Sequence, residues 1–243
     1  MASGVGILSD WPWKPLGNFK YLLLAPWAMK STYMFVTKKD PMERDFSTFL
    51  IFPFLLLRMA HNQICISLSL VIEQPKETTE SLTRALTLIK DDQILFTAIL
   101  HYLAAYILPN GRNIAIWRTD GVIITIVLHA FVVEFLYYWL HRALHHHYLY
   151  SRYHSHHHSS IVTEPITSVT HPFAELLAYI FLFSIPPATT TVTGIGSQAA
   201  IFGYMIYIDF MNNLGHCNFE FIPKWFFSVF PPLKYLMYTP SYV

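Results

Sequence analysis

The apolar run GVIITIVLHAFVVEFLYYWL, residues 121–140, and the segment HRALHHHYLYSRYHSHHHSS, residues 141–160, decide the fold of this chain. The first stretch is long enough to cross the roughly 30 Å hydrocarbon core of a bilayer as a helix. The second stretch holds eight of the thirteen histidines of the chain. So many imidazoles at the end of a membrane-like helix predict a metal site at a membrane surface.

The composition supports a membrane protein. Of the 243 residues, 53% are hydrophobic and only 13% are charged, whereas soluble domains carry about 25% charged residues. The formal net charge is +1, so no strong positive field favours a nucleic-acid partner. The two cysteines, Cys65 and Cys217, lie far apart and predict neither a disulfide framework nor a CxxC site.

Six apolar runs are expected to cross the membrane or to lie at its surface: Tyr21–Val36, Phe46–Ile72, Ile94–Leu108, Val122–Leu140, Pro172–Ala188 and Ala199–Met211. They predict an all-α multi-pass membrane protein. Residues 1–120 are expected to form an N-terminal membrane region and residues 121–243 a His-box domain. The polar segment 73–92 predicts an exposed loop with a short helix, and 189–198 predicts a tight connection after Pro186-Pro187.

Two apolar runs predict a hairpin that returns to the histidine-rich surface. His171 directly precedes the run 172–188, and His216 closely follows the run 199–211. If these runs descend and return, both histidines emerge on the surface that carries 141–158. Asp209, Asn213 and His216 form a polar stripe on the returning helix, which predicts either helix–helix hydrogen bonds or a role in the site.

Two histidine stripes follow from the spacing in 141–158. His141 and His145 are four residues apart, so both side chains leave the same face of a continuing helix. His154, His157 and His158 repeat this arrangement at spacings of three and four. Neutral imidazoles are nitrogen donors for transition metals, and the two stripes therefore predict an ordered metal site.

A simpler interpretation remains open, because a histidine-rich loop can buffer zinc or lie at lipid headgroups without an ordered centre. Glu134, seven residues before His141, is expected to accept the second N–H of a ligand. The histidines off the two stripes are expected at the surface or around the ligands: His146, His147 and His156. Those inside apolar runs are expected to be satisfied by neighbouring helix residues: His61, His101 and His129.

The HxxxH motif HRALH, followed by the HxxHH histidines of HSHHH, resembles the His boxes of the membrane fatty-acid hydroxylase and sterol-desaturase superfamily. Longer segments are similar to the eceriferum-type very-long-chain aldehyde decarbonylases of plant wax biosynthesis. These segments are DWPWKPLGNFKYLLLAPWA, WRTDG, YSRYHSHHHSSIVTEPITSV and YIDFMNNLGHCNFE. The resemblance covers essentially the whole chain.

This resemblance implies histidine-ligated iron, with two ions in the complete family site, although imidazole also suits zinc. The family ligands map onto His141, His145, His154, His157, His158 and His216. The resemblance implies no catalytic residue beyond these ligands. It further implies a multi-pass protein of the endoplasmic reticulum membrane, with its histidines facing the cytosol and electrons supplied by cytochrome b5.

The implied reaction converts very-long-chain aldehydes, made from acyl-CoA, into alkanes, in contact with membrane lipids and in a complex with a sister protein. A lipid hydroxylase or desaturase is an alternative, as is a non-catalytic truncated subunit that binds a full-length relative. The family has a further HxxHH box after a YTPSYH-like segment, whereas this chain reads YTPSYV and ends at Val243. We therefore expect a truncated chain that cannot complete the reaction alone.

Overall fold

The structure is a computed structural model that describes residues 6–40, 44, 46–72, 80–155, 158, 165, 168, 171–217, 219–220, 222–231, 233 and 237. Within these residues the chain forms α-helices and helical turns, and no strand. The α-helices are α1 (Ala25–Thr37), α2 (Phe46–Ile72), α3 (Glu80–Ile107), α4 (Thr119–Leu128), α5 (Glu134–Leu144), α6 (His147–Leu149), α7 (Phe173–Phe183), α8 (Ile185–Val192), α9 (Gln198–Gly215) and α10 (Lys224–Val229). The other helical turns are the 3-10 helix η1 (Lys14–Leu23) and the π-helical turns η3 (His129–Val133) and η4 (Tyr150–His154).

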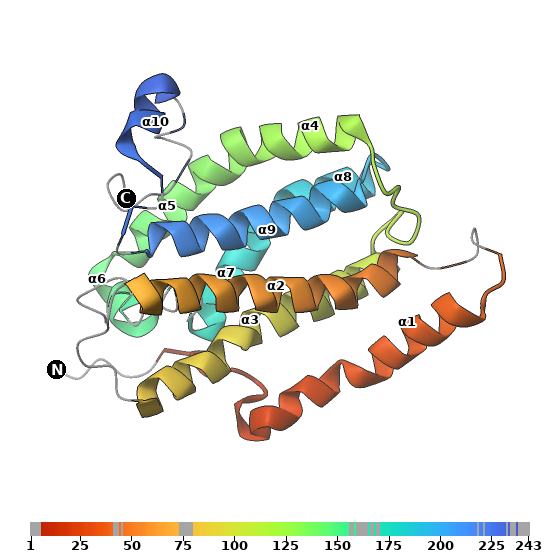
Figure 1. Cartoon of the computed structure of the whole chain (residues 1–243), viewed down its shortest axis with the longest axis horizontal. Helices are drawn as coiled ribbons and strands as arrows, with labels where there is room; N and C mark the ends of the chain where they lie inside the picture. Colours follow the sequence, from red (N-terminus) through yellow and green to blue (C-terminus); the bar gives the residue numbers. More distant parts are fainter. Residues whose placement is uncertain are drawn as a thin grey trace.

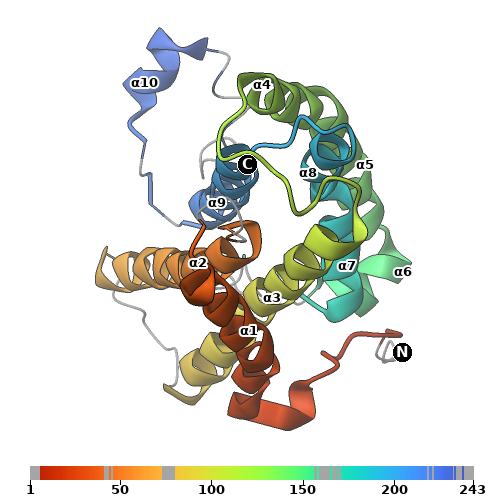
Figure 2. The same ribbon diagram turned by 90° about the vertical axis from the view of Figure 1, so that its right-hand side faces the viewer.

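The long helices run side by side along the molecule (Figure 1). Helix α2 packs on α3 and α9, and α4 packs on α8 and α9. Helix α7 contacts α5, and the view along the bundle shows α5, α7 and α8 on one side with α1 and α2 across from them (Figure 2). The end of α5, the short α6 and the end of α9 lie at the same end of the bundle, at the left of Figure 1.

Two helical segments in the described part of the chain are long and apolar enough to cross a membrane, namely Ser47–Ser69 and Thr119–Leu144. A third span results if α7 and α8, which meet at a bend of 45°, are counted as one. The predicted spans at 46–72 and 122–140 are thus confirmed. Helix α1 has 13 residues and extends only about 20 Å, which is too short to cross.

Two polar side chains inside α2, those of Arg58 and Asn62, contact α9. Arg58 and Asp209 form a buried ion pair between α2 and α9, with Nε to Oδ2 at 2.7 Å. One turn further on, the amide of Asn213 donates to Oδ1 of Asn62 at 2.9 Å. These contacts join α2 to α9, and Arg58 faces protein, as the cost of a charge in lipid requires.

The predicted exposed loop at 73–92 is wrong for the residues that the structure describes. From Glu80 onward this segment belongs to α3, which continues without a break to Ile107. Segment 80–107 contains no glycine or proline to end the helix. Asp91 and Asp92 are buried. Two contacts stabilise them there, since Tyr21 donates to Asp91 at 2.7 Å and Lys20 forms an ion pair with Asp92. Residues 73–79 lie outside the described part.

The prolines at 186 and 187 mark the bend between α7, which ends at Phe183, and α8. They lie in the first turn of α8, where a missing N–H costs no helical hydrogen bond and the fixed φ suits the helix. The predicted connection over 189–198 is therefore only partly right, because helix continues to Val192. The turn that follows depends on Gly194, whose φ of +76° other residues rarely adopt.

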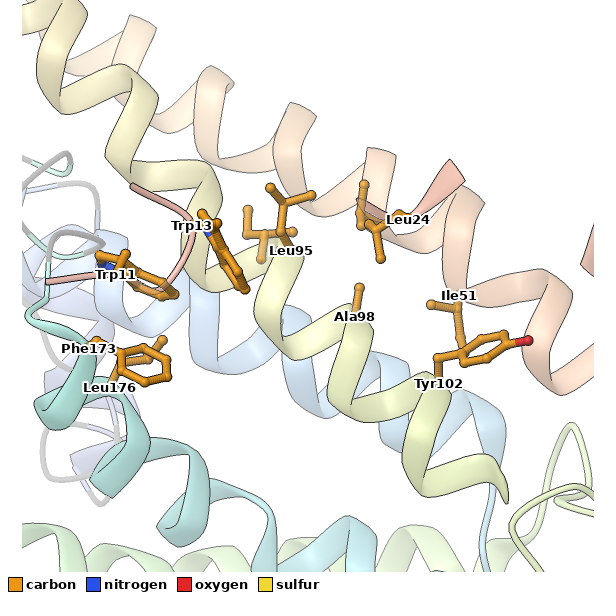
Figure 3. Close-up of a cluster of buried hydrophobic side chains, with 11 residues drawn as sticks. Trp11, Trp13, Leu24, Ile51, Leu95, Ala98, Tyr102, Phe173 and Leu176 are labelled. Carbon is orange, nitrogen blue, oxygen red and sulfur yellow. The ribbon is translucent and has the colours of Figure 1, made fainter. Parts of the chain in front are cut away.

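An aromatic cluster fastens the N-terminal segment to the bundle. Trp11 and Trp13 pack against α3 and α7 beside Phe173 and Leu95 (Figure 3). The backbone carbonyls of Leu8 and Ser9 accept the N–H groups of Ala174 and Phe173 at 2.9 and 3.2 Å. The N-terminal segment thereby satisfies donors that the first turn of α7 would otherwise leave unpaired. The start of α7, which supports the histidine cluster described below, is fixed in place by these contacts.

Candidate metal centre

The first histidine pair lies at the end of the membrane helix. His141 is in the last turn of α5, and His145 is its C-cap residue. Their rings stack with centroids 4.9 Å apart, and their Nε2 atoms are 3.0 Å apart. The predicted spacing of one helical turn is therefore present, and both rings turn the same nitrogen toward one point.

The second pair follows a π-helical turn. In η4 the N–H of Ser155 bonds to the carbonyl of Tyr150 at 2.8 Å, five residues back along the chain. π-Turns are rare and recur at functional sites. This turn ends at His154, which is 0% exposed. The Nε2 of His158 lies 3.0 Å from the Nε2 of His154.

The two pairs form one cluster. One ligand nitrogen from each of His141, His145, His154 and His158 lies within 4.8 Å of all the others. Four imidazoles around one ion at about 2.0–2.1 Å place their nitrogens about 3.3 Å apart in tetrahedral geometry. The observed contacts of 3.0 Å within pairs and the 4.8 Å limit between them bracket that distance. The residues therefore fit a single transition-metal ion.

The cluster favours neutral imidazoles. Burial, followed by the neighbouring His154, lowers the pKa of His145. Burial, followed by His154 and then His145, lowers the pKa of His158. A neutral imidazole has the free lone pair that a metal binds, whereas the protonated form has none. The local electrostatics thus hold these two side chains in the form that can act as ligands.

The other predicted ligands have different places in the structure. His216 follows α9 outside the cluster of four, and its Nδ1 lies 2.8 Å from the carbonyl of Asn212. Burial lowers the pKa of His216 to about 4, and charges on His171, His158 and His154 act in the same direction. It therefore lies near the centre, and its role as a ligand stays a prediction. His157 lies outside the described residues.

Contacts beside the cluster confirm the predicted hairpin. The Nε2–H of His171 donates to the carbonyl of Ser168 at 2.9 Å. The hydroxyl of Ser168 lies 3.4 Å from Oδ1 of Asn213 on α9. The start of α7 and the end of α9 thus meet next to the histidines. His146 and His147 are exposed and pack on each other at 4.2 Å, in agreement with their expected surface position.

Glu175 provides the carboxylate that contacts a histidine of the cluster. The prediction that Glu134 accepts the second N–H of a ligand histidine is wrong. Glu134 Oε1 lies 3.0 Å from Nε2 of His129, which is not in the cluster. Glu175 Oε1 instead lies 2.7 Å from Nδ1 of His154. Glu175 is the only acidic residue between 165 and 208. A lone carboxylate in an apolar run is a recognisable indication of function, but its partner, 21 residues away, could not be read from spacing.

Residues 126–242 match the family model described as fatty acid hydroxylase. The cluster of four histidines at the end of a membrane helix lies inside this region. Over this region the chain is similar to the fatty acid hydroxylases, a family of membrane proteins. No solved structure matches the chain.

Curated relatives narrow the class. The chain is 57% identical to very-long-chain aldehyde decarbonylase CER1 of Arabidopsis thaliana over 254 residues, which cover 100% of this chain and 40% of that protein. It is 54% identical to very-long-chain aldehyde decarbonylase GL1-5 of Oryza sativa subsp. indica, again over 100% of this chain and 40% of the relative. Protein CER1-like 1 of Arabidopsis thaliana is 55% identical. The chain spans about 40% of the length of these relatives.

Proposed function

We propose that this chain contains the metal centre of a very-long-chain aldehyde decarbonylase, which converts long aldehydes made from acyl-CoA into the alkanes of plant wax. The observation that carries the proposal is the cluster of four histidines at the end of a membrane helix. Relatives of the same type, at 57% and 54% identity over the whole chain, support the choice of reaction.

Iron is the metal that we propose for this centre. A donor set of imidazole nitrogens suits iron, zinc or copper, but zinc has no redox chemistry. A redox-active ion bound here would supply the activation of dioxygen, with electrons from cytochrome b5. The chain contributes His141, His145, His154 and His158 as ligands. His157 and His216 are proposed as further ligands, the latter because it lies near His154 and His158.

The membrane helix suits a long alkyl substrate. Phe131, Phe135 and Trp139 follow one another at spacings of four and are exposed on its surface. Apolar side chains of this kind are stable against lipid chains. A very-long-chain aldehyde in the bilayer keeps its alkyl chain among such side chains, while its carbonyl group reaches the end of the helix, where His141 and His145 lie. We propose that the histidine cluster faces the cytosol at the endoplasmic reticulum membrane. The chain would lie there beside a sister protein.

A lipid hydroxylase or desaturase on the same scaffold is the alternative, supported by the match to the fatty acid hydroxylase model. The two reactions give different products. Removal of one carbon gives an alkane that is one carbon shorter than the aldehyde, whereas hydroxylation or desaturation keeps the chain length. A non-catalytic subunit, the third candidate, would retain the helices without retaining metal.

The test measures metal and product separately. The chain is purified in detergent, loaded anaerobically with Fe²⁺, and analysed for iron and zinc per protein. His145→Ala should lower the metal content, while His147→Ala, which changes an exposed neighbour, should not. Equal metal loss in both variants, or no metal in the unmodified chain, would refute the proposed centre and favour a subunit.

The product test uses yeast supplied with very-long-chain acyl precursors. Residues 1–243 are expressed alone and joined to the remaining C-terminal part of the Arabidopsis relative, and hydrocarbons are identified by mass spectrometry. An alkane one carbon shorter than its precursor, dependent on His145, supports the decarbonylase. Products of unchanged chain length would assign the chain to the hydroxylase or desaturase alternative.

A further inference from the structure

Glu175 is a buried carboxylate that contacts the metal cluster. It lies in the first turn of α7, and its residue is only 2% exposed. A carboxylate loses strong hydration when it is buried, and proteins retain such a group where hydrogen bonds and nearby positive charge compensate. The first turn of α7 supplies part of this compensation, because the helix dipole favours a negative charge there.

One oxygen of Glu175 receives two hydrogen bonds. Oε1 accepts from the hydroxyl of Tyr179 at 3.1 Å and from Nδ1 of His154 at 2.7 Å. His171 lies further away, with Nδ1 at 3.6 Å from the same oxygen. Oε2 has no hydrogen-bond partner among the described residues. The shortest contact of the carboxylate is therefore with a histidine of the cluster.

This contact decides which nitrogen of His154 has the proton. An ionised carboxylate accepts hydrogen bonds and cannot donate them, so the 2.7 Å contact requires a proton on Nδ1. In the neutral ring Nε2 then has a free lone pair. The neighbouring contact agrees, because Nε2 of His158 lies 3.0 Å from Nε2 of His154 and can donate to it when no metal is present.

The other well-buried nitrogen of the cluster has no such partner. Nδ1 of His141 is buried and has no hydrogen-bond partner within the described residues. Its ring is held by packing instead, edge-on to Tyr137 with centroids 5.6 Å apart. Packing orients a ring without selecting its tautomer. Among these two ligands, only His154 has its proton position set by a carboxylate.

We propose that Glu175 is a positioning residue of the metal centre, which holds the proton on Nδ1 of His154 and thereby presents Nε2 to the ion. The proposal rests on the proposed function insofar as the cluster binds a metal. It adds a specific task for a residue outside the ligand set. Carboxylates that accept from a ligand histidine fix its orientation and raise its basicity, and their loss commonly lowers metal affinity about 10- to 100-fold.

Glu134 provides a matched control. Its carboxylate also contacts a histidine at 3.0 Å, but that histidine, His129, lies outside the cluster. Glu134→Gln therefore changes a Glu–His contact in the same bundle, one in which Nε2 of His129 makes no hydrogen bond. Glu175→Gln keeps the shape and one acceptor oxygen, whereas Glu175→Ala removes the acceptor. Comparing the three variants separates an effect on the metal centre from a general loss of packing.

The first measurement needs no metal. Nitrogen NMR of the ¹⁵N-histidine-labelled, metal-free chain at pH 8 reports the tautomer of each neutral ring, and His154→Gln identifies the signals of His154. We expect a protonated Nδ1 and an unprotonated Nε2 in the unmodified chain and in Glu134→Gln. In Glu175→Ala we expect the Nε2–H form to become populated. An unchanged tautomer in this variant would overturn the proposal.

The second measurement is Co²⁺ titration, followed by the visible spectrum of the bound ion. Glu175→Ala should raise the dissociation constant about 10- to 100-fold and change the spectrum, Glu175→Gln should fall between it and the unmodified chain, and Glu134→Gln should change neither. Equal weakening by Glu134→Gln, or unchanged binding in Glu175→Ala, would overturn the proposal. If the unmodified chain binds no Co²⁺, the proposed function fails, while the tautomer measurement still decides the role of Glu175.

Discussion

Replacing Arg58 by methionine removes a guanidinium group that three helices share. Its Nε and Nη2 donate to the two carboxylate oxygens of Asp209 at 2.7 and 2.9 Å, and Nη1 donates to the hydroxyl of Thr97 at 2.6 Å. The side chains of Arg58 and Asp209 are only 8% and 5% exposed. The substitution therefore leaves a buried carboxylate without its cation, between α2 and α9.

The expected cost follows from this burial. Removing one member of a buried ion pair costs about 3–5 kcal/mol, because the remaining charge stays desolvated. For a chain of this size, such a loss lowers the midpoint of thermal unfolding by about 10 °C. Replacing both residues by apolar ones is often neutral. The double variant Arg58→Met, Asp209→Leu should therefore recover most of the stability.

The assay is equilibrium unfolding of the detergent-solubilised chain, followed by far-ultraviolet circular dichroism, for both single variants and the double variant. Lys14→Met is the control, because it removes the ion pair between Lys14 and Asp10. Their side chains are 68% and 73% exposed, respectively. Pairs as exposed as this contribute about 0–1 kcal/mol. A loss below about 1 kcal/mol for Arg58→Met, or a double variant as unstable as the single one, would refute the reasoning.

Three further outcomes are expected. His145→Ala should weaken metal binding about 10- to 100-fold relative to His147→Ala in a Co²⁺ titration, and equal affinities would indicate a loose chelator. Gly121→Ala should cost about 1–3 kcal/mol in the unfolding assay, because a Cβ would collide with a carbonyl of the loop after α8, whereas Gly203→Ala has open space and should be tolerated. The pKa of His216 is lowered to about 4, so between about pH 6.5 and pH 4 the unfolded state binds its proton first. Stability of the metal-free chain should fall by up to about 3 kcal/mol over that range, and a similar fall in His216→Gln would contradict this assignment.

Hydropathy alone was enough to predict two membrane-spanning helices, because their apolar residues are continuous in the sequence. The runs at 46–72 and 122–140 contain enough apolar residues in sequence to stand out, and both are helices of the expected length. The run at 94–108 was predicted and forms the second half of α3, but the first half of this helix was read as a loop because it is polar. Its acidic residues Asp91 and Asp92 are stabilised by Lys20, Tyr21 and Trp13, some 70 residues away. Such long-range compensation has no periodicity, so composition suggested a loop.

In the metal site too, contacts between residues close in sequence were predicted, whereas a contact from a distant helix was not. The pairing of His141 with His145 follows from a helical spacing, and so does the contact of His154 with His158. The carboxylate was assigned to Glu134 because it lies on the same helix, whereas the structure brings Glu175 from another helix. Spacing can predict partners within one element. It does not predict which element packs against it.

The π-helical turn η3 determines where the membrane helix can lose a single residue without reorienting His141. Its extra residue lets the N–H of Glu134 reach the carbonyl of His129, five positions back, inside a helix that otherwise bonds four positions back. Deleting one residue within η3 would restore a regular α-helix and leave His141 facing its present neighbours. Deleting one residue between Glu134 and His141 would instead rotate the histidine by about 100°. A natural relative that lacks one residue of this helix should therefore lack it within η3 and keep a constant length between Glu134 and His141.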